Sequence, residues 1–296
     1  MATASFSRMS GLRRLSVVVF ATAAVFVASA VATAAPPHGH EPSPHGAQFV
    51  ALGDSGAATT GKISLDLHAP IRCMQSTVNS PKLVAAQLGL VLDDRSCSGA
   101  KIAHLATSQA AGIAPQFDAL GPATKVVTLH IGANDVPTTR NHVECHLDSL
   151  AAGDCATAAA AWPQRTEAIA GAYGAALDEI ARRAPEAQIF VDGWPTYVRE
   201  QSCPAVLLTP GAATTVQRGY DLLNSLVARE ATKRGAIYID TRGPGIGHDA
   251  CAPDTERWIE PLLAGDTLMP FHLTPLGMRG VADLIAFSVR THLTTR

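Results

Sequence analysis

The tetrapeptide Gly53-Asp54-Ser55-Gly56 is the first place in this chain where residue types and spacing point to chemistry. It follows the apolar run at 49–52, so Ser55 is expected at the end of a buried strand. A serine hydroxyl is a weak nucleophile at neutral pH and needs a general base, together with donors for the oxyanion it creates. The best candidate for the base is His272, far downstream. The pattern therefore predicts nucleophilic catalysis by a serine and a histidine.

Two other serine-hydrolase motifs share part of this tetrapeptide. In trypsin-like proteases the serine lies in Gly-Asp-Ser-Gly-Gly-Pro, late in the chain and after its histidine. Here Ser55 precedes His272, and Ala57 replaces the second glycine. The nucleophile elbow of α/β-hydrolases is Gly-x-Ser-x-Gly, which position 57 also fails. The order of residues disfavours both classes and leaves a serine delivered early, after a first strand.

Short apolar runs alternate with longer helical patterns, and this alternation is typical of a parallel sheet covered on both faces. The expected fold is therefore α/β, a single-domain three-layer α/β/α sandwich with a central, mostly parallel sheet. Ligands bind outside the carboxyl ends of the strands in such sheets, so the chemistry is expected at that edge. Strands are expected at 48–52, 90–94, 126–131, 188–192 and 236–240, and helices at 80–89, 163–184, 212–234 and 275–293.

The N-terminus has the composition of an export signal. Arginines precede an apolar stretch at 15–31 and small residues follow it, so residues 1–34 are interpreted as a secretory signal peptide. Arg13 and Arg14 also fit a twin-arginine signal. An uncleaved membrane anchor is the other alternative, although the run is short for one. We expect a secreted protein, either extracellular or in the cell envelope, without stable membrane insertion after cleavage.

The mature chain is acidic and long enough for one large domain. Removal of the signal takes away three arginines and no acidic residue, so the formal net charge of −2 becomes −5. Nothing in this balance indicates a nucleic-acid partner. Residues 35–47 are rich in Pro, His and Gly and are interpreted as a linker, and residues 48–296 are expected to form the hydrolase domain, as a monomer.

All six cysteines lie in the mature part, and an even number in an exported chain indicates disulfides. Six cysteines allow about 15 sets of pairs, and the residues alone do not choose among them. Neighbours along the chain make the simplest set. No Cys-x-x-Cys is present, which disfavours a zinc site or a redox motif. The simplest set is Cys73–Cys97, Cys145–Cys155 and Cys203–Cys251.

Four separated blocks of this sequence resemble the SGNH, or GDSL, hydrolases. Residues 53–55 are similar to the block that carries the nucleophile, and 96–100 resemble the second block of the secreted bacterial lipases. Residues 132–135 fit Gly-x-Asn-Asp, and 271–277 are similar to the block with the base. The resemblance spans roughly 48–290. All four blocks occur in family order, which is far more specific than any block alone.

The resemblance implies an SGNH-hydrolase fold of flavodoxin-like type and a role for each matched residue. Ser55 would be the nucleophile and His272 the base. The amides of Ser55 and Gly99 and the side chain of Asn134 would donate to the oxyanion. No cofactor and no metal are implied. The cysteine order is similar to the three-disulfide pattern of secreted members of the family, which supports the simplest set of pairs.

The chain departs from the family pattern at the third catalytic position. The usual block is Asp-x-x-His, and here Met269 stands three residues before His272. A methionine side chain cannot accept the imidazole N–H as a carboxylate does. In some secreted relatives a main-chain carbonyl orients the ring, so we expect the carbonyl of Met269 to do so, giving a Ser–His dyad. Asp266 is the alternative partner.

These observations favour a secreted serine ester hydrolase, a carboxylesterase or lipase that works through an acyl-enzyme on Ser55. Its substrate would be a small-molecule or lipid ester. The alternatives are a phospholipase, a thioesterase, a carbohydrate deacetylase, or an impaired binding or envelope protein on the same fold, which the missing aspartate motivates. His130 is expected to be structural, whereas His248 and Trp194 are weaker candidates for substrate contact.

Overall fold

The structure of the protein is a computed structural model that describes residues 47–62, 64–136, 138–263, 267 and 269–293. The expected signal peptide (1–34) and all but the last residue of the expected linker (35–47) lie outside the described residues. The remainder forms one compact α/β unit.

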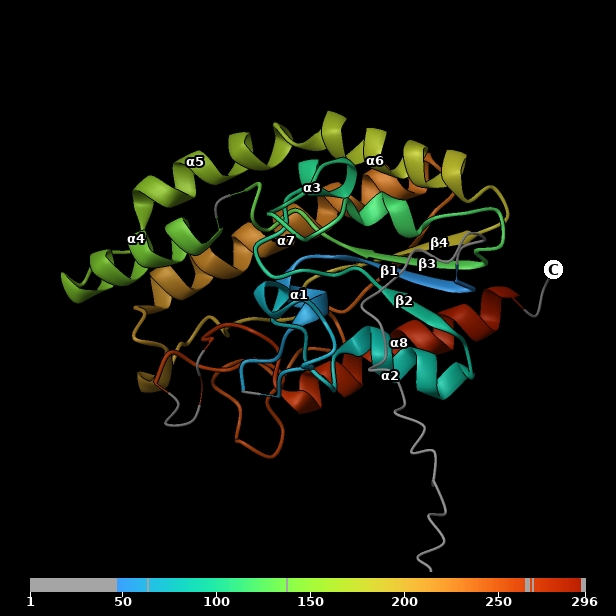
Figure 1. The fold of residues 1–296 in the computed structure, drawn as a ribbon. Helices are drawn as coiled ribbons and strands as arrows, with labels where there is room; N and C mark the ends of the chain where they lie inside the picture. The colour runs from blue at the N-terminus through green and yellow to red at the C-terminus, as the bar shows by residue number, and fades with distance from the viewer. Residues whose placement is uncertain (1–46, 63, 137, 264–266, 268, 294–296) are drawn as a thin grey trace, which may run out of the picture. The chain divides into compact units, whose positions relative to one another are not determined.

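A five-stranded parallel sheet forms the centre of this unit, in the order β2-β1-β3-β4-β5 (Figure 1). Within the described residues, neighbouring strands of this sheet all pair in parallel, and Gly53 of β1 pairs with His130 of β3. Residues of β1, β3 and β4 are fully buried, which is why these strands are continuous apolar runs in the sequence. The strands are β1 (Phe49–Gly53), β2 (Leu92–Asp94), β3 (Val126–His130), β4 (Gln188–Asp192) and β5 (Ile237–Ile239).

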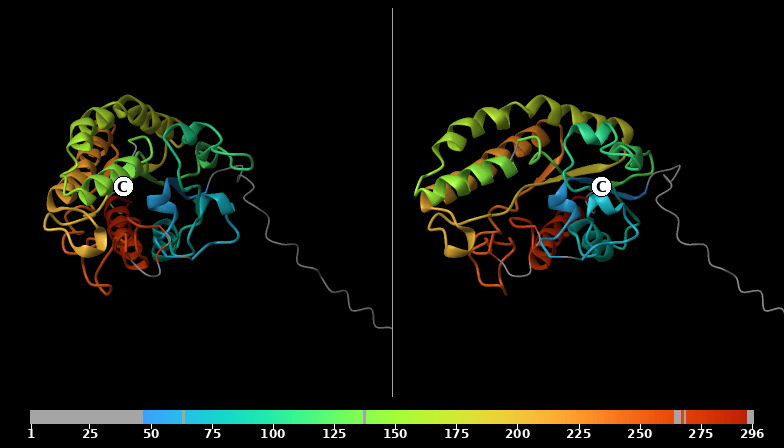
Figure 2. Two further views of the ribbon diagram at one scale, coloured as in Figure 1. Left: turned by 90° about the vertical axis from the view of Figure 1, so that its left-hand side faces the viewer. Right: turned by 60° about the vertical axis from the view of Figure 1, so that its left-hand side comes forward.

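Helices cover both faces of the sheet, as the sequence predicts. The group of α4 to α7 lies on one face, and α2 and α8 pack against each other on the opposite face (Figures 1 and 2). The longer helices are α2 (Ser80–Leu88), α4 (Thr138–Leu150), α5 (Ala156–Glu167), α6 (Ala170–Arg183), α7 (Pro210–Lys233) and α8 (Pro275–Leu293). Short helical turns are α1 (Ser55–Ala58), α3 (Ala103–Ala106), η1 (Ile71–Cys73), η2 (Gln116–Ala119) and η3 (Pro204–Val206).

Local capping chemistry sets the ends of two of these helices. Asn79 caps α2 by accepting a hydrogen bond from the Lys82 amide, and Thr209 caps α7 in the same way from the Ala212 amide. The prediction of a single helix at 163–184 is wrong in one respect, because this stretch belongs to two helices, α5 and α6. Ile169 adopts φ −90° and ψ −6°, which departs from helical values and interrupts the hydrogen-bond ladder there.

The six cysteines form three disulfides, and the simplest set of pairs is the one present: Cys73–Cys97, Cys145–Cys155 and Cys203–Cys251.

Within the described part of the chain, no helix is long and apolar enough to cross a membrane. No group of three or more His, Cys, Asp or Glu side chains in those residues is arranged to hold a metal ion.

Candidate active site

Ser55 lies at the carboxyl edge of the sheet, where β1 ends and α1 begins. The Oδ1 atom of Asp54 accepts a hydrogen bond of 2.9 Å from the Gly56 amide and so caps the short helix. Glycine is required at position 53 because a Cβ there would lie 2.6 Å from the main-chain oxygen of His130. The tight strand-to-helix turn thereby holds the Ser55 hydroxyl at the edge of the sheet.

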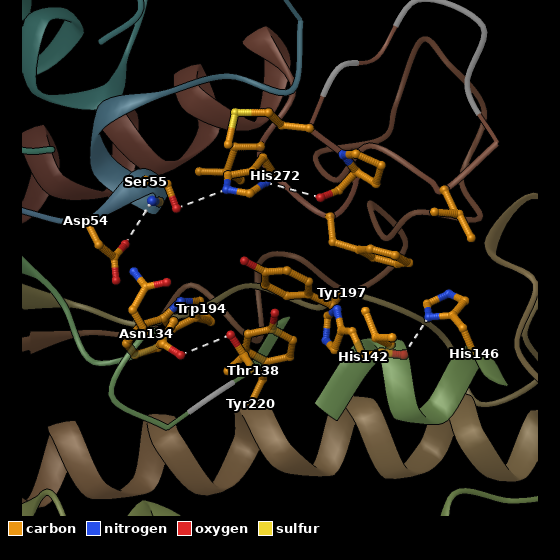
Figure 3. Close-up of a pocket in the computed structure, with 18 residues that line it drawn as sticks. Asp54, Ser55, Asn134, Thr138, His142, His146, Trp194, Tyr197, Tyr220 and His272 are labelled. Atoms are coloured by element: carbon orange, nitrogen blue, oxygen red, sulfur yellow. Dashed lines mark hydrogen bonds between the residues drawn. The ribbon is translucent and has the colours of Figure 1, made fainter. Parts of the chain in front are cut away.

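His272 reaches the same edge from the segment that precedes α8. This segment forms an antiparallel bridge between Leu273 and Ile259, and Glu260 donates its amide to the His272 carbonyl at 2.9 Å. The Nε2 atom of His272 lies 2.9 Å from the Ser55 Oγ (Figure 3). Two residues 217 positions apart are thus in hydrogen-bond contact, which is the geometry of a nucleophile and its base.

The imidazole of His272 lies beside two main-chain carbonyls, that of Pro270 and that of Met269, the one that the sequence predicts. Its Nδ1 lies 3.1 Å from the Pro270 oxygen, whereas the Met269 oxygen accepts from the His272 amide at 3.3 Å. Phe271, which stands between Pro270 and His272, has φ +59°, so the chain turns sharply just before the base. Asp266, the alternative partner, lies outside the described residues.

This contact also fixes the tautomer of the ring. A carbonyl oxygen only accepts, so the proton sits on Nδ1 and Nε2 is left to accept from the Ser55 hydroxyl. Burial lowers the pKa of His272, and the carbonyls of Pro270 and Met269 oppose that effect. The base is therefore neutral at neutral pH, which is the form that can take a proton.

Two of the expected oxyanion donors occupy different surroundings. Asn134 lines the cavity beside Ser55, and its Nδ2 donates one hydrogen bond of 2.9 Å to the Ala100 carbonyl. An amide nitrogen carries two protons, so one remains for a substrate oxygen. Gly99 is exposed at φ +77° and does not belong to the described cavity lining. The neighbouring Asp135 accepts from the Ile102 amide at 3.0 Å and ties the two segments together.

A buried pair of His130 and Asp192 lies under the nucleophile turn. Their Nδ1 and Oδ2 atoms are 2.8 Å apart, and a Cβ on Gly56 would lie 2.2 Å from the His130 Nε2. Burial raises the pKa of Asp54 to about 6, and the nearby His130 imidazole acts in the opposite direction. His130 packs directly beneath the turn that carries Ser55 and does not line the cavity. This position fits the structural role expected for it.

One cavity of about 380 Å³ contains both Ser55 and His272. The sequence predicted the catalytic residues at one end of this cavity, but it did not predict most of the other lining residues, because these come from helices and loops far apart in the chain. Trp194 lines the cavity, whereas His248 stacks on Trp258 away from it. The missed wall residues include Thr138, His142, Val143, His146, Tyr197, Tyr220 and Phe271 (Figure 3).

Together the turn, the serine–histidine contact and the cavity at the carboxyl edge of a parallel sheet define a serine hydrolase. Residues 51–279 match the model of the GDSL-like lipase/acylhydrolase family. The chain belongs to this family, and it is a carboxylic ester hydrolase, as its motifs predict.

Similar proteins agree with this membership. Lipase 2 of Streptomyces coelicolor is 36% identical over 254 residues, which cover 79% of this chain and 83% of that protein. The structure of phospholipase A1 from Streptomyces albidoflavus has a TM-score of 0.70 and 27% identity, covering 82% of this chain and 99% of that one. An extracellular lipase from Streptomyces rimosus has a TM-score of 0.69 and 26% identity, covering 80% and 97%.

Proposed function

We propose that the protein is a secreted serine esterase or lipase that cleaves carboxylic esters through an acyl-enzyme on Ser55. The observation that carries this proposal is the 2.9 Å contact between the Ser55 Oγ and the His272 Nε2 inside a cavity of about 380 Å³. Such a cavity is within the usual size of small-ligand sites.

In the proposed reaction His272 Nε2 takes the proton of Ser55 as the Oγ bonds to the ester carbonyl carbon. The oxyanion is then held by the Ser55 amide and the Asn134 side chain, which line the cavity, whereas Gly99 lies outside the lining. Losing one such donor costs about 3–4 kcal/mol. His272 returns the proton to the alkoxide as the carbon–oxygen bond breaks. Water, deprotonated by the same imidazole, releases the acid.

Small-molecule or lipid esters are the proposed substrates, and export is the proposed location. The relatives named lipase and phospholipase A1 support a lipid substrate. Three disulfides suit an oxidising compartment outside the cytoplasm. We propose that residues 1–34 direct this export and that the mature chain acts as a monomer.

The test is an ester series from acetate to palmitate, with Ser55→Ala and His272→Ala proteins beside the unaltered chain. We expect turnover in the unaltered protein and a loss of at least about 10⁴-fold in both variants. A phosphonate inhibitor should label Ser55. A folded protein that is not labelled and hydrolyses no ester would instead support the binding or envelope role.

A further inference from the structure

The part of the cavity away from Ser55 is built mainly from aromatic side chains (Figure 3). Tyr197 and Tyr220 stack with ring centroids 3.8 Å apart and an interplanar angle of 14°. Burial raises the pKa of both phenol groups, so both hydroxyls stay protonated. Phe271 completes this wall, whereas Trp194 lines the cavity beside Asn134, nearer to Ser55. Flat aromatic faces favour an apolar or aromatic group at this end of the cavity.

His142 is the polar exception within this wall. It comes from α4, is 7% exposed, and meets the rings of Tyr220 and Phe271 at angles of 73° and 75°. These are ring contacts and not hydrogen bonds. The Nε2 atom of His142 is buried, and the described residues give it no hydrogen-bond partner. A buried polar atom without a partner costs about 1–3 kcal/mol, so the folded protein keeps this histidine at an energetic disadvantage.

The neighbouring histidine on the same helix face provides a contrast. His146 also lines the cavity, but its Nδ1 lies 2.7 Å from the His142 carbonyl and its Nε2 lies 2.8 Å from the Val206 carbonyl. Both of its ring nitrogens thus face main-chain carbonyls, and a neutral ring donates its single N–H to one of them. Of these two histidines, His142 is the one with hydrogen-bonding capacity left for a ligand.

His142 is also in a single, defined protonation state. Burial, together with the nearby imidazoles of His146 and His272, lowers the pKa of its imidazole to about 3. The ring is therefore neutral under ordinary conditions, with one nitrogen donating and the other accepting. A neutral imidazole suits a neutral hydroxyl group better than a carboxylate or an ammonium group.

We propose that His142, with Tyr197, Tyr220 and Phe271, forms an acyl-recognition subsite for aromatic acyl groups that carry a hydroxyl substituent. This inference rests on the proposed ester hydrolysis at Ser55. The aromatic wall takes the ring of the acyl group, and the imidazole of His142 hydrogen-bonds its hydroxyl. A plain phenyl or alkyl chain fills the same space but leaves the imidazole without a partner.

The test compares two esters that differ by one hydroxyl, ethyl 3-(4-hydroxyphenyl)propionate and ethyl 3-phenylpropionate, hydrolysed in a pH-stat at pH 7.5. The phenol is neutral at this pH. We expect kcat/KM to be about tenfold higher for the hydroxylated ester, the size that one well-made hydrogen bond gives. A ratio of one or below in the unaltered protein would overturn the inference without needing any variant.

Three variants then assign the preference to the imidazole. His142→Phe should bring the ratio to about one or below, while His142→Gln, which keeps a donor and an acceptor, should retain part of the preference. Val143→Ala alters an apolar residue of the same cavity and should leave the ratio unchanged. An unchanged ratio in a folded His142→Phe protein would contradict the role of His142.

Failure of this inference is distinguishable from failure of the proposed function. If ethyl octanoate and both aryl esters are hydrolysed at equal rates, the ester hydrolase stands and the subsite falls. If no ester is hydrolysed above the Ser55→Ala background, the proposed function itself falls.

Discussion

At the scale of single residues, we propose that the main-chain carbonyls of Pro270 and Met269 take the place that a carboxylate occupies in a Ser-His-Asp triad. A carbonyl orients the imidazole and selects its tautomer, but it offers less charge to an imidazolium than an aspartate does. The low pKa that burial gives His272 keeps the ring neutral without that charge. The site therefore depends on the conformation of the turn at Phe271 more than on an acidic side chain.

The first prediction concerns Asp266, the acidic residue nearest along the chain to this turn. If the Pro270 carbonyl orients the base, Asp266→Ala should change kcat by no more than about threefold, because no catalytic contact is removed. A loss near ~10⁴-fold, as when a triad acid is disabled, would contradict the dyad. His272→Ala, measured with the same ester, is the reference for full loss.

A second prediction concerns the buried carboxyl of Asp54, whose pKa is raised from 3.8 to about 6. The folded state binds this proton more tightly than the unfolded state does. The contribution of the protonated carboxyl to the stability of the fold is therefore complete below pH 3.8 and is lost as pH rises through 6. Above pH 6 the ionised carboxylate costs up to about 3 kcal/mol. Asp54→Asn should therefore gain stability over the unaltered protein between pH 4 and pH 8, measured by urea unfolding at each pH.

Asp66 is a control for this prediction, because its pKa is lowered where that of Asp54 is raised. Lys82 bonds its carboxylate at 2.7 Å, and this hydrogen bond lowers the pKa of Asp66. Its stabilisation is present above the unfolded pKa and lost in acid, so Asp66→Asn should lose stability at pH 8 and not at low pH. The same pH trend in both variants would contradict this assignment.

Residues that act through local motifs were predictable, and those that act through a distant partner were not. Ser55 and His272 stand in short blocks whose chemistry can be recognised in the letters. The contact of the His272 ring with the Pro270 carbonyl could not be predicted, since it depends on the backbone path through residues 269–272. His142 had no signal at all, because it lies in a mostly polar stretch that the sequence pattern did not identify as a helix.

At the scale of elements, α5 and α7 pack so closely that no side chain larger than that of glycine fits at their contact. A Cβ at Gly219 of α7 would lie 2.1 Å from the Cε2 atom of Trp162, which is 1% exposed. The sequence pattern predicted the helix at 212–234 correctly, but α4 was not predicted. Its residues are mostly polar, and the helix is held by a disulfide at Cys145 and by its neighbours more than by an apolar stripe.

The third prediction follows from this contact. Gly219→Ala should lower the free energy of unfolding by about 1–3 kcal/mol, because the methyl group overpacks against a fully enclosed indole. Gly171 is the matched control in α6, since a Cβ there meets nothing within 4 Å. Gly171→Ala should gain about 0.5–1 kcal/mol from helix propensity. Equal effects in the two variants would show that packing at Trp162 does not decide the result.

At the scale of the whole molecule, the chain is a parallel sheet whose carboxyl edge carries loops long enough to build a cavity. The Cys203–Cys251 disulfide joins the loop after β4 to the loop after β5, close to where the Ala250 amide bonds the Tyr197 carbonyl at 3.0 Å. The layered fold could be predicted because the strand and helix patterns are strong. The shape of the cavity could not, because it depends on how loops distant in sequence are held together.

The last prediction ranks two disulfides by the chain that they close. The sequence separation is 48 for Cys203–Cys251 and 10 for Cys145–Cys155. If the bonds act mainly by restricting the unfolded chain, the Cys203→Ser/Cys251→Ser protein should lose about 4 kcal/mol and the Cys145→Ser/Cys155→Ser protein about 3 kcal/mol. Urea unfolding of both proteins measures the difference. A larger loss from the shorter loop would mean that native contacts around Cys145, beside the α4 histidines, are what that bond protects, and that the helix bearing His142 depends on it.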